Sequence, residues 1–181
     1  GRENTKLPGA VLGSNITVTS NAKAAIQGAD FILSAIPLQS TRATLADLVG
    51  RFEGQPLIGC SKGVDLATGL GGYSVLQACY PDGPVGLLTG PSFATDIAGG
   101  LPTALTLAAD ASQAVNAWQS DLSTDTLRLY ISHDPIGAEL GGALKNVIAI
   151  ACGAAMGAGL GESARAALIT RGQAEIMRYA V

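Results

Sequence analysis

Charged side chains are scarce in this sequence. Only 14% of the 181 residues are Asp, Glu, Lys or Arg, and the formal net charge is −3. Such a chain has no overall positive field that would attract nucleic acid or an anionic membrane surface. We therefore expect no nucleic-acid partner, and any anionic ligand must be held by local cations or backbone amides.

Cysteine is also rare. Cys60, Cys79 and Cys152 are widely spaced and form no C-x-x-C pair. This pattern argues against a disulfide framework and against a zinc site. We expect no bound metal and a reducing, cytoplasmic location.

Secretion signals and long apolar runs are missing as well. No cationic stretch followed by an apolar run opens the chain. The longest apolar run, Val147 to Leu160, is rich in Gly and Ala and shorter than the ~20 residues needed to cross a bilayer. We expect a buried helix there and no membrane span. The dinucleotide fingerprint G-x-G-x-x-G and the P-loop pattern are both absent.

What the sequence does contain, between residues 15 and 131, is an alternation of β-branched runs with amphipathic segments. This alternation predicts a doubly wound, Rossmann-type α/β fold, in which helices cover both faces of a parallel sheet. The expected strands are Asn15–Thr19, Asp30–Ile36, Gln55–Cys60, Val85–Thr89, Pro102–Ala108 and Leu127–Ile131. The expected helices are Asn21–Gln27, Thr41–Phe52, Tyr73–Cys79 and Ser112–Leu122, with N-caps at Ser20, Ser40 and either Asp110 or Ser112.

The β-pattern stops at His133-Asp134-Pro135, after which Ile136–Gly159 and Ser163–Val181 are predicted as two long helices. The sequence thus divides into a partial dinucleotide-binding domain, residues 1–132, and the start of an all-α substrate or dimerisation domain, residues 133–181. The chain opens in a polar loop without Met and closes inside a helical pattern that has no stop signal. We expect a fragment with an incomplete sheet that lacks a first β-α-β unit.

A lysine, Lys145, interrupts the apolar helical segment after residue 140. Its neighbours three and four residues away are Gly141, Gly142, Ile148 and Ala149, so no acidic partner neutralises it along the helix. Burial there would lower the pKa of the ammonium, as a proton donor and acceptor requires. The alternative is a lysine that extends from the helix into solvent.

A second candidate segment, Thr89-Gly90-Pro91-Ser92-Phe93-Ala94, directly follows an expected strand. In open α/β sheets, ligands bind beyond the carboxyl ends of the strands, where glycine allows close backbone approach. The alternative is an ordinary Gly-Pro turn.

Two other strand ends carry candidate residues. Lys62, in Cys60-Ser61-Lys62-Gly63, places a cation at the same rim as Gly90 and could hold a phosphate, or else it is a solvated loop lysine. The segment Ser34-Ala35-Ile36-Pro37 also ends an expected strand. Its proline could turn the chain away from the sheet next to a bound cofactor, or it could simply mark the start of an ordinary loop.

Two arginines, Arg165 and Arg171, and the single histidine are assigned no catalytic role. Glu162 lies three residues from Arg165, and Glu175 lies four from Arg171, so helix ion pairs are favoured over anion binding. The single histidine, His133, has no metal-ligand or nucleophile companion and is expected to be structural.

Taken together, four segments resemble bacterial NAD(P)-dependent glycerol-3-phosphate dehydrogenase, and their order and spacing match across nearly the whole chain. They are Ser61-Lys62-Gly63, Gly90-Pro91-Ser92-Phe93-Ala94, Leu140-Gly141-Gly142-Ala143-Leu144-Lys145-Asn146-Val147-Ile148-Ala149 and Ala166-Ala167-Leu168-Ile169-Thr170-Arg171-Gly172. The resemblance implies reduction of dihydroxyacetone phosphate to sn-glycerol 3-phosphate with NAD(P)H, feeding glycerophospholipid synthesis.

The resemblance also implies roles for individual residues. Lys145 would be the general acid that protonates the C2 oxygen of the substrate. Substrate contacts would come from Lys62, Gly90, Ser92 and Asn146. The cofactor would be bordered by Lys62, Ala94, Ile36 and Pro37.

Other readings remain open from the sequence. One is another Rossmann-type keto reductase with a helical second domain, such as a ketopantoate or hydroxyacid reductase. Another is a non-catalytic remnant that contributes only folding or dimerisation surface. Because the glycine fingerprint and the family's later aspartate and serine-arginine-asparagine segment are absent, we expect this chain alone to be inactive or nearly so. A homodimer formed through the helical domain is a further hypothesis.

Overall fold

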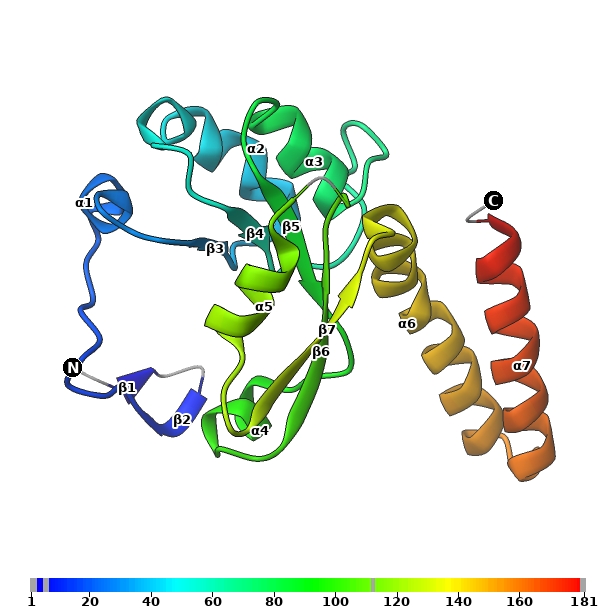
Figure 1. Ribbon diagram of the computed structural model, residues 1–181. Coiled ribbons are helices and arrows are strands. Elements are labelled where there is room, and N and C mark those ends of the chain that lie inside the picture. Colours follow the sequence, from blue (N-terminus) through cyan, green and yellow to red (C-terminus); the bar gives the residue numbers. More distant parts are fainter. Residues whose placement is uncertain (1–2, 5–6, 112, 180–181) are drawn as a thin grey trace.

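A five-stranded sheet forms the centre of the protein, whose computed structural model describes residues 3–4, 7–111 and 113–179 (Figure 1). The strands lie side by side in chain order, β3-β4-β5-β6-β7. Their bounds are β3 Ile32–Ser34, β4 Leu57–Gly59, β5 Val85–Thr89, β6 Thr103–Ala108 and β7 Leu127–Ser132. Five of the six expected strands are therefore confirmed, some of them shorter than predicted.

The sheet is mixed, so the prediction of an all-parallel sheet is wrong for one pair of strands. β3–β4, β4–β5 and β6–β7 are parallel, but β6 runs antiparallel to β5. The connection between β5 and β6 contains only the short helix α4, Ala94–Ala98. Five helical residues rise about 7.5 Å. A parallel crossover would have to carry the chain back about 17 Å along a five-residue strand, and α4 is too short to span that distance.

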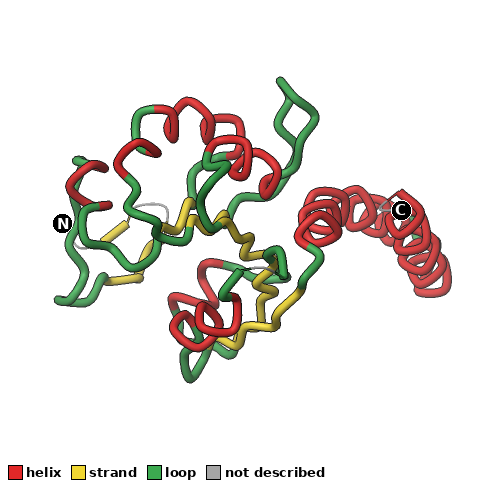
Figure 2. The backbone as a smooth tube through the Cα atoms, turned by 45° about the horizontal axis from the view of Figure 1, so that its top comes forward, coloured by secondary structure: helices red, strands yellow, loops and turns green. Residues whose placement is uncertain are grey.

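Helices cover both faces of the sheet, as predicted for a Rossmann-type fold. α2 (Leu38–Ala46) and α3 (Gly72–Cys79) lie on one face and α5 (Val115–Leu122) on the other (Figure 2). Successive side chains of a strand point to opposite faces of the sheet, so each strand contributes to the core on both faces. Leu57 packs in the core under α2 and α3, while its neighbour Ile58 packs in the core with α5. Burial of each such side chain contributes about 1.5–3 kcal/mol.

The expected helices are found with altered ends. α1 spans Ala22–Ile26. The predicted helix Thr41–Phe52 starts earlier, at Leu38, and ends at Ala46, before a 3-10 turn, η1, at Val49–Arg51.

The predicted N-caps are wrong where they can be compared. Asn21, not Ser20, caps α1, because its side chain accepts a hydrogen bond from the Ala24 N–H at 3.2 Å. Ser40 lies inside α2, which begins directly after Pro37. α5 begins after Ala114 rather than after Asp110, and Ser112 lies outside the described residues.

The region before α1 differs most from expectation. No strand forms at Asn15–Thr19, where Val18 is exposed and no neighbouring strand offers hydrogen bonds. Instead, β2 (Leu7–Val11) pairs antiparallel with β1 (Glu3–Asn4), in the segment predicted as a polar loop.

Two long antiparallel helices, α6 (Pro135–Gly157) and α7 (Gly161–Tyr179), follow the sheet and extend away from it (Figure 1). The side chain of Asp134 caps α6 by accepting a hydrogen bond from the Gly137 N–H at 2.8 Å. Gly159, at φ 71°, ends α6, and the Leu160 N–H bonds back to the Ala155 carbonyl at 3.0 Å.

The prediction that the apolar part of α6 is buried is wrong. α6 packs on α3, β5 and β6 near its start and on α7 along its length, and Val147 and Ile150 remain exposed. By length and composition alone α6 is able to cross a membrane, which is weak evidence because helices of soluble proteins meet the same criterion.

Candidate active site

Three loops with predicted site residues leave the same edge of the sheet. β3, β4 and β5 are parallel, so their carboxyl ends meet there. Pro37, Lys62 and Gly90 follow these three strands. This is the edge at which open α/β sheets bind ligands.

A groove of about 690 Å³ lies between the sheet and α6. Its lining includes Gly90 from the loop after β5 and Lys145 from α6, so the two strongest sequence candidates share one site. Part of its floor is a row of register-paired residues with hydroxyl groups on three strands: Thr89, Thr106 and Tyr130.

The path of α6 explains how Lys145 reaches the groove. Ala138, in its first turn, packs against the core under α3. One turn later, Gly142 meets the end of β5: a Cβ built on Gly142 would lie 2.9 Å from the Thr89 Oγ1 and 3.9 Å from the Lys62 Cγ. Lys145 is one further turn along the same helix face. The absence of a side chain at position 142 therefore lets α6 approach both Thr89 and Lys62.

Gly90 is held in a conformation that suits glycine. Its φ is 149°, and a Cβ there would lie 2.9 Å from the Leu105 Cδ2 and 3.3 Å from the Leu105 Cα. The close approach of this loop to β6 therefore depends on the missing side chain.

Of the two alternatives for Lys145, burial and extension into solvent, the structure shows the second. Its side chain is exposed, and its Nζ donates a hydrogen bond to the Asn146 Oδ1 at 3.1 Å. Within the described part of the chain, Lys145 belongs to no ion pair. The ammonium is open because the face of α6 that carries it borders the groove rather than a packed element.

The other predicted residues do not line the groove. Ser92 is half-buried just before α4, and Ala94 is exposed as the first residue of that helix. Ile36 is half-buried and Pro37 exposed after β3. Lys62 and Asn146 are exposed beside Gly142 and Lys145 respectively.

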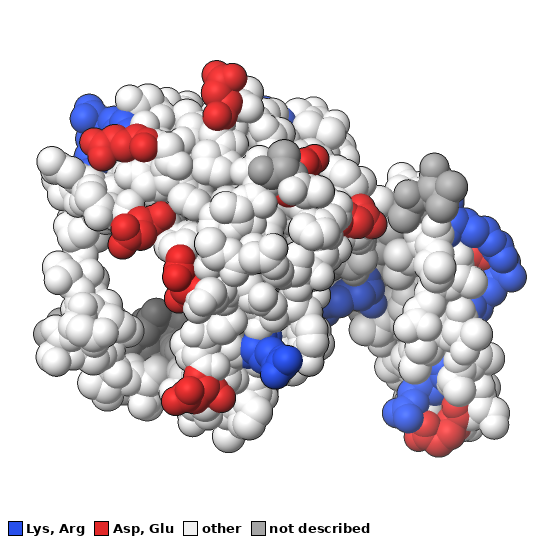
Figure 3. All heavy atoms as spheres, in the orientation of Figure 1, with Lys and Arg blue, Asp and Glu red and all other residues white. Residues whose placement is uncertain are grey.

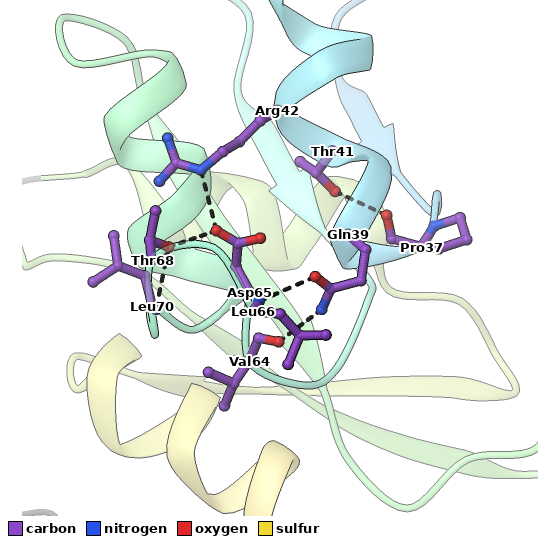
Figure 4. Close-up of polar contacts among 9 residues, drawn as sticks. All are labelled: Pro37, Gln39, Thr41, Arg42, Val64, Asp65, Leu66, Thr68 and Leu70. Atoms are coloured by element: carbon purple, nitrogen blue, oxygen red, sulfur yellow. Dashed lines mark hydrogen bonds and ion pairs between the residues drawn. The ribbon is translucent and has the colours of Figure 1, made fainter.

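A clamp that sequence reasoning missed fixes the loop after Lys62 to α2 (Figure 4). The Gln39 side chain donates to the Val64 carbonyl at 2.7 Å and accepts from the Leu66 N–H at 3.0 Å. Asp65 is buried, accepts a hydrogen bond from the Thr68 hydroxyl at 2.5 Å and pairs with the Arg42 Nε at 3.4 Å. The Thr68 hydrogen bond and the Arg42 cation together hold the pKa of Asp65 below its ordinary value, although burial opposes them.

A second missed residue, Glu139, joins α6 to α3. Its carboxylate is buried and accepts hydrogen bonds from the Ser74 backbone N–H at 3.1 Å and the Ser74 hydroxyl at 2.8 Å. Ser74 lies in the first turn of α3, where backbone N–H groups lack helical partners and negative charge is favoured. The sequence signal was present, because Glu139 is an acid in an apolar helix six residues before Lys145.

Cys60, at the same edge, does not offer a thiolate nucleophile. Burial raises the pKa of its thiol, and the nearby Lys62 only partly opposes this. Acyl transfer through this cysteine is therefore disfavoured.

Charge supports a site for an anion in the groove. Lys or Arg side chains are visible in the hollow between the sheet and the helix pair (Figure 3), and Lys145 lines the groove. The arginines of α7 are otherwise engaged, as predicted: Arg165 pairs with Glu162 at 2.6 Å, and Arg171 pairs with Glu175 at 2.5 Å.

The class of protein follows from these features. The chain is a Rossmann-type α/β protein with an appended pair of helices. Loops with glycine and lysine lie at the carboxyl edge of its sheet, and the first appended helix brings a further lysine to that edge. A family model described as NAD-dependent glycerol-3-phosphate dehydrogenase N-terminus matches residues 1–115, and its C-terminus counterpart matches residues 134–181. The chain belongs to this family.

Curated relatives and solved structures agree with this assignment. The chain is 55% identical over 180 residues to glycerol-3-phosphate dehydrogenase (NAD(P)+) of Roseobacter denitrificans and 55% identical over 181 residues to that of Ruegeria sp.. These matches cover 99% of this chain and 56% of each relative, so the chain spans about half their length. The crystal structure of glycerol-3-phosphate dehydrogenase from Coxiella burnetii matches with a TM-score of 0.85 and 32% identity, over 96% of this chain and 53% of the other.

Proposed function

We propose that this chain is part or all of an oxidoreductase that reduces dihydroxyacetone phosphate to sn-glycerol 3-phosphate with NAD(P)H. The observation that carries the proposal is the groove that Gly90 and Lys145 share at the edge where Lys62 also lies. The proposal is supported by the two relatives named glycerol-3-phosphate dehydrogenase (NAD(P)+), each 55% identical to this chain.

In this proposal Lys145 is the catalytic acid. Reduction of the ketone develops negative charge on the C2 oxygen, and a nearby ammonium both stabilises that charge and supplies the proton. Its Nζ donates the proton to that oxygen, and in the reverse reaction the neutral amine accepts it. Asn146, whose Oδ1 accepts a hydrogen bond from Nζ at 3.1 Å, orients the lysine and helps order the substrate.

Substrate contacts are assigned to Lys62, Gly90 and Ser92. Lys62 offers a point charge to the phosphate. The loop after β5 offers backbone amides to phosphate or hydroxyl oxygens, because Gly90 has no side chain to keep a ligand away.

The residues present fit one side of a dinucleotide site. Ile36 and Pro37 give an apolar surface after β3, Ala94 begins the helix after β5, and Lys62 lies between these strand ends. When bound, the reduced nicotinamide supplies the hydride for C2.

We also propose the division into a partial dinucleotide-binding domain, residues 1–132, and a helical domain beginning at residue 133. The boundary is supported by the end of the last strand at Ser132 and the start of α6 at Pro135. A cytoplasmic protein without a membrane span is also proposed. It is supported by the buried Glu139, which bonds α6 to Ser74 of α3, and by Lys145, which puts a charge on the face of α6 that lines the groove. The exposed Val147 and Ile150 offer surface for a homodimer.

The test follows NAD(P)H oxidation on addition of dihydroxyacetone phosphate, using this chain, the product of the complete gene, and the Lys145→Met and Lys23→Met variants of that product. We expect turnover by the complete product and by Lys23→Met, which changes an exposed lysine on α1. Lys145→Met should lose activity. Turnover with a different keto acid only would favour another reductase, and no turnover with any keto substrate would favour a non-catalytic remnant.

A further inference from the structure

A threonine hydroxyl at the floor of the groove lacks a protein partner. Thr89, the last residue of β5, is only 8% exposed and lines the groove. Among the described residues, its hydroxyl makes no hydrogen bond. By contrast, the hydroxyls of Thr41, Thr44 and Thr68 each donate to an oxygen within 3.3 Å. Since no fully buried side-chain oxygen or nitrogen among the described residues lacks a partner, the Thr89 hydroxyl keeps contact with the groove and is available there to a ligand or water.

The surroundings of this hydroxyl indicate which kind of ligand it meets. The Thr89 Oγ1 faces Gly142 on α6, and the alkyl chain of Lys62 reaches the same point. Lys145 is one helical turn beyond Gly142 and lines the same groove. The Thr89 hydroxyl therefore lies beside Gly142 and the Lys62 side chain, on the groove that Lys145 also lines, and it is able both to donate and to accept a hydrogen bond.

We propose that Thr89 is a further substrate-binding residue, whose hydroxyl hydrogen-bonds to an oxygen of the phosphorylated three-carbon substrate held between Lys62 and Lys145. This inference rests on the proposed function. Gly142 is part of the same device, because any side chain there would press on the Thr89 hydroxyl. In this proposal Thr89 positions the substrate, so removal of its hydroxyl should weaken substrate binding rather than cofactor binding.

The test compares Thr89→Val, which keeps the shape and removes the hydroxyl, with Thr89→Ser, which keeps the hydroxyl, in the product of the complete gene. Thr44→Val is the matched control, because it removes an exposed hydroxyl on α2. Loss of one hydrogen bond predicts that Thr89→Val raises the KM for dihydroxyacetone phosphate about three- to tenfold. The KM for NAD(P)H should stay within about twofold, and Thr89→Ser should restore the wild-type KM.

Two results would overturn the inference while leaving the proposed function intact. One is an unchanged KM for dihydroxyacetone phosphate in Thr89→Val. The other is an equal rise in both KM values that Thr89→Ser does not reverse, which indicates a structural role. A wild-type protein without activity on this substrate refutes the proposed function itself, and the inference with it.

Discussion

The buried contact between Glu139 and Ser74 leads to a quantitative prediction about stability. Glu139→Gln keeps the size of the side chain but replaces one carboxylate oxygen with an NH2 group. Both carboxylate oxygens accept hydrogen bonds from Ser74. In the variant the amide oxygen can still accept from the Ser74 N–H, and the amide NH2 can donate to the Ser74 hydroxyl oxygen, so two hydrogen bonds to a charged group become two neutral ones. A hydrogen bond to a charged group contributes about 1.5–3 kcal/mol and a neutral one about 0.5–1.5 kcal/mol. We expect Glu139→Gln to lower the free energy of unfolding by about 1–3 kcal/mol.

The assay is urea unfolding followed by the fluorescence of Trp118, the single tryptophan, whose side chain is buried between α5 and the sheet. Glu162→Gln is the matched control, because its exposed pair with Arg165 should contribute at most about 1 kcal/mol. Ser74→Ala completes a double-mutant cycle, and we expect a coupling energy of about 1 kcal/mol or more with Glu139→Gln.

The reasoning is refuted if Glu139→Gln costs no more than Glu162→Gln. It is equally refuted if the effects of Glu139→Gln and Ser74→Ala simply add, because independent effects would mean that the two side chains do not depend on each other.

Three further predictions concern other parts of the site. The pKa of Asp65 is depressed in the folded state, so its stabilising effect is present above its ordinary pKa of 3.8 and is lost as the pH falls through the lower folded value. In thermal melts, the stability difference between wild type and Asp65→Asn should therefore shrink as the pH falls below 3.8. A difference that stays constant with pH would contradict this. Gly90→Ala should lower the free energy of unfolding by about 1–3 kcal/mol in urea titrations because of its φ and its contact with Leu105; an unchanged midpoint would show that the loop can move away. Lys145→Met should lower kcat about 10²- to 10⁴-fold in the product of the complete gene, and a kcat near wild type would remove this lysine from the chemistry.

Local sequence was sufficient wherever a segment is covered on both sides. The run Val85–Thr89 was predicted with the bounds that the structure has, because an apolar run between turns becomes a buried strand almost anywhere in a sheet. The direction of the next strand was not predictable in the same way. It depends on how far the chain travels between Thr89 and Thr103, and this depends on the five-residue helix α4, which the sequence reading missed.

The segment Asn15–Thr19 shows the limit of strand propensity. Its β-branched residues favour extended backbone, but a strand also needs a neighbour that supplies hydrogen bonds. That neighbour is set by distant parts of the chain, and among the residues that the structure describes no strand pairs with this segment.

For the site, sequence reasoning identified Lys145 and Gly90 because each is unusual in its place: a lysine in an apolar helix, and a glycine directly after a buried strand. It missed Glu139 and Asp65 because their importance lies in burial and partners from distant segments, which no spacing rule reports. It left open whether Lys145 is buried or extends into solvent, because burial depends on what packs against a helix face and not on the composition of that face.

These buried acceptors explain how two exposed lysines can still be placed accurately. Glu139 lies six residues before Lys145, about 9 Å along the axis of α6, and fixes that helix to α3. On the other side, Gln39 and Asp65 fix the loop that follows Lys62 to α2. The backbone near each lysine is thus held by polar contacts, of which those of Glu139 and Asp65 are buried, while both lysine side chains are exposed and able to meet a substrate. Loosening either anchor should therefore weaken substrate binding even though neither anchor touches the groove.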